Sequence, residues 1–217
     1  GQWITRCHRA GAAEEDVIRA LKDACSEGPK YIYTLAQRLK LASLVVKNVK
    51  KRTGAEIYGF KFSSPHFNFG HRMFPNSHFV YIIRDPRDVA ASQKQRGFEK
   101  TLREICWGWN SYIRAFNAFR NKLPEIAQIV RYEDLVSQPQ QTVLEIFRKL
   151  PIEFETGVLR FYASKATVHS SNHPNAVNLK RDFFTGSIRR WETQLSYKEV
   201  KTIEKSCGKY MKAFFYE

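Results

Sequence analysis

The spacing of apolar residues along the chain predicts that helices alternate with strands. Apolar residues recur every three or four positions in four long stretches, as in amphipathic helices that pack on a core; these cover residues 12–25, 33–51, 100–123 and 196–214. Three shorter stretches are rich in β-branched and aromatic residues and are bounded by turn-forming residues, as strands are; these cover residues 56–62, 78–83 and 126–131.

Local signals mark several helix ends. Thr53 and Gly54 end the second helix, because glycine favours the left-handed conformation that closes helices. Pro139 starts a further helix over residues 140–150, and Ser196 with Glu199 forms a capping box at the start of the last one.

Strands that alternate with helices predict an α/β fold, a three-layer sandwich with a central parallel sheet flanked by helices. Ligands of such folds bind beyond the carboxyl ends of the strands. A length of 217 residues fits a single domain. Residues 164–190 have no periodicity and predict a long ordered loop, which at this length is usually functional.

The charge of the chain favours an anionic partner. The formal net charge is +15, from 36 Lys and Arg against 21 Asp and Glu, which attracts nucleic acid, anionic lipid, acidic polysaccharide or a phosphorylated small molecule. The basic residues are spread along the sequence, so a dedicated nucleic-acid tail is not favoured. No apolar run approaches the roughly 18 residues of a membrane span, and no membrane anchor is visible.

The cysteines do not predict a metal site. Cys7, Cys25, Cys106 and Cys207 are widely separated and lack metal-ligand spacing, so we expect no metal. The last three lie on apolar helix faces, which predicts buried reduced thiols. Unpaired cysteines slightly favour a cytoplasmic protein, although a Golgi lumen location remains open if an anchor was removed.

The most informative stretch runs from a buried strand, residues 79–83, through Arg84, Asp85 and Pro86 into a helix. Asp85 is a suitable cap and Pro86 suits the first helical turn, so backbone N–H groups gather at the end of the strand and form an anion site. Ser92 and Arg96 are four residues apart and can approach the same phosphate. Alternatively, Arg84 and Arg96 only pair with nearby aspartates at the surface.

This stretch resembles the 3′-phosphate-binding motif of sulfotransferases that use 3′-phosphoadenosine 5′-phosphosulfate (PAPS), namely a strand that ends in Arg-x-Pro with Ser eight residues after the Arg. The resemblance implies a P-loop-kinase-like sulfotransferase fold. It implies that Arg84 and Ser92 hold the 3′-phosphate of the cofactor, which leaves as PAP, and that Arg96 assists them.

Further motifs follow in the order that the family has. Tyr132 precedes Glu133, Asp134 and Leu135, which is similar to a family strand whose Tyr lies near the adenine; the two acids themselves are expected in capping and loop hydrogen bonds. Lys61 occupies a position that resembles the catalytic lysine of the family. A fixed ammonium there stabilises negative charge on the departing phosphate.

Residues 184–191, which end in Trp191, resemble the family's cofactor-covering loop. The resemblance places Gly186, Arg189 and Arg190 at the cofactor, although both arginines could also only solvate the loop. The cytosolic branch has Arg-Lys-Gly where this chain has Phe184, Thr185 and Gly186. The Ser-Ile-Arg-Arg-Trp sequence is closer to the bacterial, protein-tyrosine and Golgi-like branches.

Two parts of the family pattern are incomplete. Gly1 to Ile4 resemble only the last residues of the phosphosulfate-binding loop, so we expect residues 1–217 to form one sulfotransferase domain that is incomplete at its N-terminus; Trp3 then stacks on adenine. The activity of residues 1–217 without that loop is open. For the catalytic base, His66 is the candidate, against the alternative that it is a surface histidine.

The sequence therefore predicts sulfuryl transfer from PAPS to a hydroxyl or amine of a small-molecule, glycan or peptide acceptor. A non-catalytic basic module that binds nucleic acid or acidic glycan is the alternative, although nucleic acid is not the favoured partner. A nucleotide kinase is a weaker alternative, because it needs Gly-Lys-Ser/Thr and a magnesium carboxylate, which are absent. The oligomeric state is not predicted.

Overall fold

A computed structural model describes residues 12–26, 34–54, 57–59, 61–62, 64–97, 100–163 and 181–216. Trp3, a predicted adenine contact, lies outside the described residues. The chain divides into two compact units, one formed by Gly1–Asn76 with Lys165–Ala176 and the other by Ser77–Ser164 with Val177–Glu217. That all 217 residues form one domain stays a prediction.

In the first unit, helices α2 (Glu14–Cys25) and α3 (Leu35–Thr53) pack together and α4 (Phe67–Met73) contacts α3. Their contact buries Val17 and Ala20 of α2 against Val45 and Val49 of α3, as the apolar stripes predict. Gly54 ends α3 with φ 67°, the left-handed conformation expected of a glycine at that position.

The strand predicted over residues 56–62 is wrong for its described part. Residues 57–59 and 61–62 form neither helix nor strand. A strand requires a neighbour that accepts and donates its backbone hydrogen bonds, and the apolar composition that favoured a strand says nothing about such a partner. Ile57 is 54% exposed, which also contradicts a buried strand.

The second unit contains two parallel strands, β1 (Phe79–Ile83) and β2 (Ala127–Arg131), which lie where the sequence predicts them. Their register pairs Phe79 with Ala127 and Ile83 with Arg131. Helix α5 (Pro86–Gln95) follows β1 directly, and α6 (Leu102–Arg120) leads back toward β2. The strands therefore end at the same edge of the sheet.

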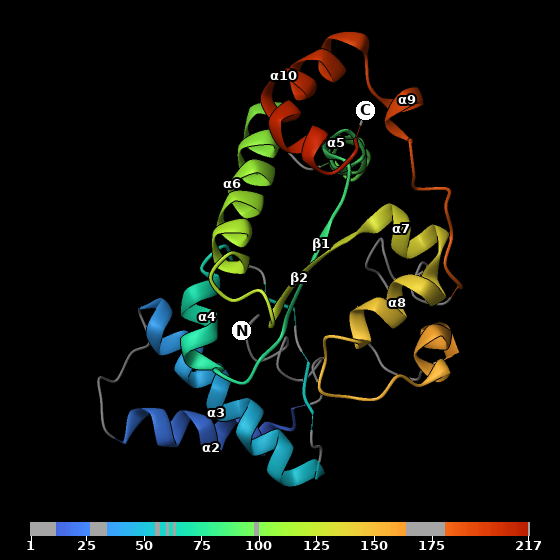
Figure 1. The fold of residues 1–217 in the computed structure, drawn as a ribbon. Coiled ribbons are helices and arrows are strands. Elements are labelled where there is room, and N and C mark those ends of the chain that lie inside the picture. The colour runs from blue at the N-terminus through green and yellow to red at the C-terminus, as the bar shows by residue number, and fades with distance from the viewer. Residues whose placement is uncertain are drawn as a thin grey trace. The chain divides into compact units, whose positions relative to one another are not determined.

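Helices cover both faces of these strands (Figure 1). Side chains alternate between faces along a strand, and one face packs on α6, where the Tyr81 ring lies 5.0 Å from that of Phe116. On the opposite face, Gln128 donates to the carbonyl of Ile146 in α8 (Pro139–Phe147) at 3.1 Å. The predicted parallel sheet flanked by helices is confirmed.

Short elements and the C-terminal helix complete this unit. Helix α7 (Tyr132–Ser137) follows β2, a 3-10 helix covers Thr156–Ala163, and α9 (Trp191–Gln194) precedes α10 (Tyr197–Ala213). Helix α10 packs on α6 and buries Ile203 and Cys207 beside Ile113 and Cys106. The core thus joins α10 to α6, the helix that lies between β1 and β2 in the sequence.

Two expectations about cysteines and membranes can be compared with the described residues. Cys106 and Cys207 are buried free thiols, as predicted, whereas the prediction for Cys25 is wrong, because it ends α2 and is exposed. Among the described helices, none has the length and apolar character needed to span a bilayer.

Candidate functional site

The turn after β1 has the geometry of an anion site. The Asp85 carboxylate caps α5 by accepting the N–H of Arg87 at 2.8 Å, and Pro86 occupies the first turn. The indole N–H of Trp109 donates to the Arg84 carbonyl at 2.9 Å and fixes the backbone there. The first N–H groups of α5 and its positive dipole end therefore lie at the carboxyl end of β1, as predicted.

The Arg84 side chain is held among three groups. Its guanidinium lies 4.7 Å from the centre of the Tyr132 ring at the end of β2, and its Nη2 donates to the carbonyl of Ser187. Asp88 lies 3.9 Å away, and the Arg84 side chain is 19% exposed. The Nε atom is buried without a hydrogen-bond partner among the described residues. The structure thus brings Arg84 and Tyr132, two predicted site residues, together with residue 187.

Asp88 connects α5 to the loop before α9. Its carboxylate accepts the backbone N–H of Arg189 at 2.9 Å and that of Trp191 at 3.1 Å. Burial raises the pKa of Asp88, while the N–H of Trp191, the charge of Arg84 and the N–H of Arg189 oppose this rise. The segment from Ser187 to Trp191 therefore lies against the turn that carries Arg84.

The remaining residues predicted for the cofactor differ in their surroundings. Ser92 is partly buried on α5, one turn after Asp88. Arg96 follows the last helical residue and is exposed. Gly186 is exposed, and Arg190 is partly buried. Their roles at a cofactor stay predictions.

Arg189 has a surface ion pair. Its Nε donates to Glu192 at 2.7 Å, and its side chain is 72% exposed. Its backbone has φ 59°, a left-handed conformation that is uncommon for a residue other than glycine. The backbone of Arg189, through its N–H, contacts the site more directly than the side chain for which the prediction was made.

The two predicted catalytic residues lie in the first unit. Lys61 is exposed in a segment without regular structure. His66 precedes α4 at the cap position, and its N–H donates to the Ser64 hydroxyl at 3.3 Å. The His66 side chain is exposed and makes no capping hydrogen bond. The catalytic roles of both residues stay predictions.

Sequence reasoning missed Arg87, which supports the site from within α5. Arg87 is 4% exposed, bonds to Asp85 at 2.8 Å and to Glu204 of α10 at 3.3 Å, and lies 4.1 Å from the centre of the Trp191 ring. Burial opposes its charge, but the hydrogen bonds and charges of Asp85 and Glu204 raise its pKa. Arginine in the first turn of a helix after a buried strand was the available signal.

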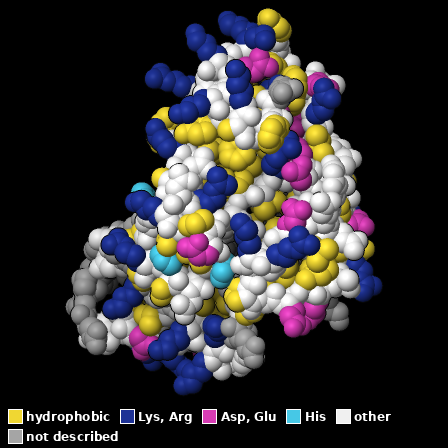
Figure 2. Space-filling model, viewed as in Figure 1, with side chains coloured by type: hydrophobic (Ala, Val, Ile, Leu, Met, Phe, Trp, Pro, Cys, Tyr) yellow, Lys and Arg dark blue, Asp and Glu magenta, His cyan; other side chains and the backbone are white. Residues whose placement is uncertain are grey.

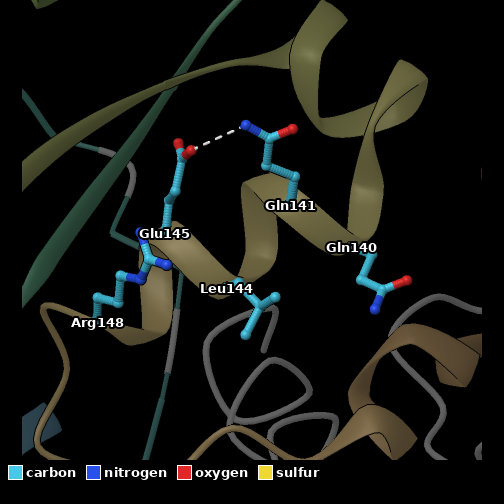
Figure 3. A pocket seen from close by; sticks show the side chains of 5 residues that line it. All are labelled: Gln140, Gln141, Leu144, Glu145 and Arg148. Atoms are coloured by element: carbon cyan, nitrogen blue, oxygen red, sulfur yellow. Dashed lines mark hydrogen bonds between the residues drawn. The ribbon is translucent and has the colours of Figure 1, made fainter.

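Two hollows in the described part of the second unit lie away from the residues around Arg84. One of about 350 Å³ is lined by residues of α8 and the residue after it (Figure 3), where Gln141 donates to Glu145 at 3.3 Å. Another of about 400 Å³ lies beside β2 and α8 and includes Arg131 and Lys149. Neither contains a residue that the sequence predicted for the cofactor.

The fold is that of an α/β protein whose parallel strands are flanked by helices, and comparison with known proteins gives its family. A family model described as the sulfotransferase family matches residues 5–156. The chain therefore belongs to the sulfotransferase family, as its motifs predicted.

Relatives and solved structures agree with this assignment. Carbohydrate sulfotransferase 4 of Mus musculus is 23% identical over 163 residues, 63% of this chain and 41% of that protein. A candidate protein-tyrosine sulfotransferase of Caenorhabditis elegans is 32% identical over 96 residues, 41% of this chain and 37% of that protein. The chain thus spans less than half the length of these relatives.

The sulfotransferase domain from the curacin biosynthetic pathway superposes with a TM-score of 0.56 at 20% identity, covering 91% of this chain and 80% of that one. The sulfotransferase domain from the olefin synthase of Synechococcus PCC 7002 gives 0.50 at 17% identity, covering 87% and 74%. These likenesses establish the fold.

Proposed function

We propose that this chain binds PAPS at the carboxyl ends of β1 and β2 and takes part in sulfuryl transfer to a hydroxyl or amine acceptor. One observation carries the proposal: the Arg84 guanidinium, the Tyr132 ring and the loop at residues 187–191 converge where α5 begins. A helix N-terminus together with a fixed guanidinium is a suitable environment for a phosphate.

The residues present fit an anionic nucleotide. Arg84 Nε is a buried donor without a partner among the described residues, and such a group costs free energy unless a ligand or water bonds to it. In the proposed role, Arg84 and the Ser92 hydroxyl hold the 3′-phosphate, with Arg96, Gly186, Arg189 and Arg190 as further candidates. Tyr132 and Trp3 are the candidates beside the adenine.

The bound cofactor supplies an activated sulfuryl group. With that group bound, Lys61 would stabilise negative charge on the leaving phosphate, because an ammonium held there would interact more strongly with the transition state than with the ground state. His66 accepts the proton of an attacking hydroxyl as the general base. Both assignments rest on sequence position and on the exposed placement of the two side chains.

The acceptor class is proposed as small molecule, glycan or peptide. Two relatives support the last two, since their names refer to carbohydrate and to protein tyrosine. The cytoplasm and the Golgi lumen both remain compatible with the proposal, because compartments are set by signals and not by the fold.

Calorimetric titration with PAP tests the nucleotide site directly. We expect binding near micromolar for the wild-type chain and a loss of at least about 1.5 kcal/mol in Arg84→Ala, the size of one charge-assisted hydrogen bond. That loss corresponds to a roughly tenfold higher dissociation constant. PAP is the suitable probe because it does not react.

Arg148→Ala is the matched control. Arg148 is an exposed residue just after the end of α8, so its removal changes the net charge equally without touching the strand end. Equal weakening by both substitutions would indicate nonspecific attraction to the basic chain, which is the alternative basic module. No binding of PAP to the folded wild-type chain would reject the proposed function.

A further inference from the structure

Asp88 is a buried acid whose position a surface ion pair does not explain. It lies in the first turn of α5, and its side chain is 1% exposed. A buried carboxylate costs free energy unless donors compensate for its lost hydration. The two N–H groups that compensate for it come from Arg189 and Trp191, about a hundred residues later in the chain.

The same carboxylate acts on Arg84. The Arg84 Nη2 atom is 3.9 Å from Asp88 Oδ2, and it donates to the Ser187 carbonyl from the same loop. The loop and the guanidinium are therefore held by a connected set of contacts in which Asp88 is the shared acceptor. Without Asp88, neither N–H has its acceptor, and Arg84 loses the nearest negative charge on α5.

The backbone of Arg189 depends on a fixed contact of this kind. Its φ of 59° is an uncommon conformation for a residue with a side chain, and such conformations persist where surrounding bonds determine them. The N–H that Asp88 accepts belongs to this residue. The ring of Trp191, two positions further, contacts the Arg87 guanidinium, which lies 4.1 Å from the ring centre.

We infer that Asp88 is a positioning residue, which fixes the loop of residues 187–191 and the Arg84 guanidinium in the arrangement that binds the 3′-phosphate of the nucleotide. The inference rests on the proposed function. Asp88 itself does not bind the phosphate, because a carboxylate and a phosphate are both anions and repel each other. It acts by holding the donors that do.

A competing role gives the opposite expectation. In that role Asp88 would occupy N–H groups that a phosphate needs, so its removal would free them for the ligand. Positioning predicts weaker nucleotide binding after removal of the carboxylate, whereas occupation predicts stronger binding. The sign of the change in affinity therefore decides between the two roles.

The experiment compares Asp88→Asn with the wild-type chain. We expect the dissociation constant for PAP to rise about tenfold, while that for adenosine 5′-monophosphate, which lacks the 3′-phosphate, changes less than about twofold. A merely structural role would weaken both nucleotides alike. Asp134→Asn is the control, because that carboxylate is 51% exposed and forms a surface ion pair with Arg131 at 3.3 Å.

Hydrogen exchange gives a readout that does not depend on nucleotide binding. The amides of Arg189 and Trp191 should exchange at least about tenfold faster in Asp88→Asn, while those of the buried part of α10 keep their rates. Unchanged exchange of both loop amides, or unchanged or tighter binding of PAP, would overturn the inference. Failure of the wild-type chain to bind PAP would reject the proposed function and the nucleotide part of the inference. The exchange rates of the Arg189 and Trp191 amides would still decide whether Asp88 holds the loop.

A smaller substitution guards against misfolding. If Asp88→Asn does not fold, Asp88→Ser removes the charge with less steric demand and is measured in the same way. Far-ultraviolet circular dichroism shows whether each variant keeps the secondary structure of the wild type. If neither variant folds, Asp88 is required for the fold itself, and the assignment as a positioning residue is overturned.

Discussion

At the scale of single residues, Glu133 joins two parts of the second unit that are far apart in sequence. Its Oε1 accepts the backbone N–H of Asp85 at 3.0 Å, and its Oε2 accepts the hydroxyl of Tyr216 at 2.9 Å. The expectation that this acid makes loop hydrogen bonds is confirmed. Glu133 therefore links the turn after β1 to the end of the chain.

Replacing Tyr216 by phenylalanine should measure this link. Tyr216 is 5% exposed. Tyr216→Phe therefore removes the hydroxyl that donates to Glu133, and water cannot easily take its place. We expect the free energy of unfolding in urea to fall by about 1 kcal/mol. Tyr197→Phe is the control, because Tyr197 is 78% exposed and should change little. Equal stability of both variants and the wild type would contradict this account.

The pH dependence of the same link has a definite sign. Burial, followed by the charge and hydrogen bond of Glu133, raises the pKa of Tyr216 above its ordinary value. The folded state thus favours the neutral phenol. The contribution of Tyr216 to the free energy of unfolding is therefore complete below pH 10, the ordinary pKa, and decreases as pH rises above 10. The difference in free energy of unfolding between Tyr216→Phe and the wild type should therefore decrease only at strongly alkaline pH.

Sequence could predict the local part of the site and not its long-range part. Asp85 as a cap and Pro86 in the first turn follow from neighbouring residues, and both are confirmed. The partners of Asp88 lie about a hundred residues away, in a loop without periodicity. Such contacts depend on how distant segments pack, and no local pattern of residues specifies that.

At the scale of elements, the start of α10 combines a capping box with an ion pair between helices. Glu199 accepts the N–H of Ser196 at 2.7 Å and the ammonium of Lys94 in α5 at 2.9 Å. The N–H of Ser196, the Lys94 ammonium and the Ser196 hydroxyl lower the pKa of Glu199 to about 2. The predicted capping box is therefore confirmed and extended by a contact between two helices.

Glu199→Gln should separate the contribution of the carboxylate charge to stability from that of the capping box. Glutamine completes the corresponding box of α3, where Gln37 accepts the N–H of Thr34 at 3.0 Å, so the box itself survives. We expect a loss of about 0.5 kcal/mol at pH 7, the size of an exposed ion pair. Because folding lowers the pKa of Glu199, the difference in free energy of unfolding between Glu199→Gln and the wild type should shrink as pH falls below about 4.5, the ordinary pKa.

Urea unfolding at a series of pH values measures this gap. Lys94→Met is the complementary variant, since it removes the other charge and should reduce the effect of Glu199→Gln when both are combined. A gap between Glu199→Gln and wild type that does not change with pH would show that the carboxylate charge contributes nothing to stability.

Long amphipathic helices were predictable, whereas short elements were not. Helices α6 and α10 each repeat their apolar stripe over several turns, so the sequence locates them to within a few residues. Helix α7, with six residues, and the 3-10 helix at Thr156–Ala163 are too short to show a period. The strand predicted over residues 56–62 is wrong for its described residues, because composition does not specify a pairing partner.

At the scale of the whole molecule, the net charge of +15 gives a field that no single residue accounts for. Helix α10 contributes lysines every three or four positions along one exposed face, at positions 198, 201, 205, 209 and 212. Figure 2 shows several Lys and Arg side chains at the top of the view, over this helix. Such a field raises the rate at which an anionic ligand meets the protein.

The last prediction separates this field from direct contacts. Changing Lys198, Lys205 and Lys212 to glutamate should lower the association rate of PAP by about fivefold in dilute buffer. The dissociation rate should stay within about twofold, because distant charges steer a ligand but do not hold it. At about 1 M salt the Debye length falls to about 3 Å, so the variant and the wild type should then associate equally fast.

Stopped-flow tryptophan fluorescence over a range of salt concentrations measures both rates, and the same three lysines changed to arginine form the control because they keep the charge. A faster dissociation rate in the glutamate variant would mean that these lysines contact the nucleotide. An unchanged association rate at low salt would mean that the attraction arises within the strand-end site alone. In the expected case, the charge spread along the sequence serves encounter, while Arg84 and the groups around it determine how long the nucleotide stays bound.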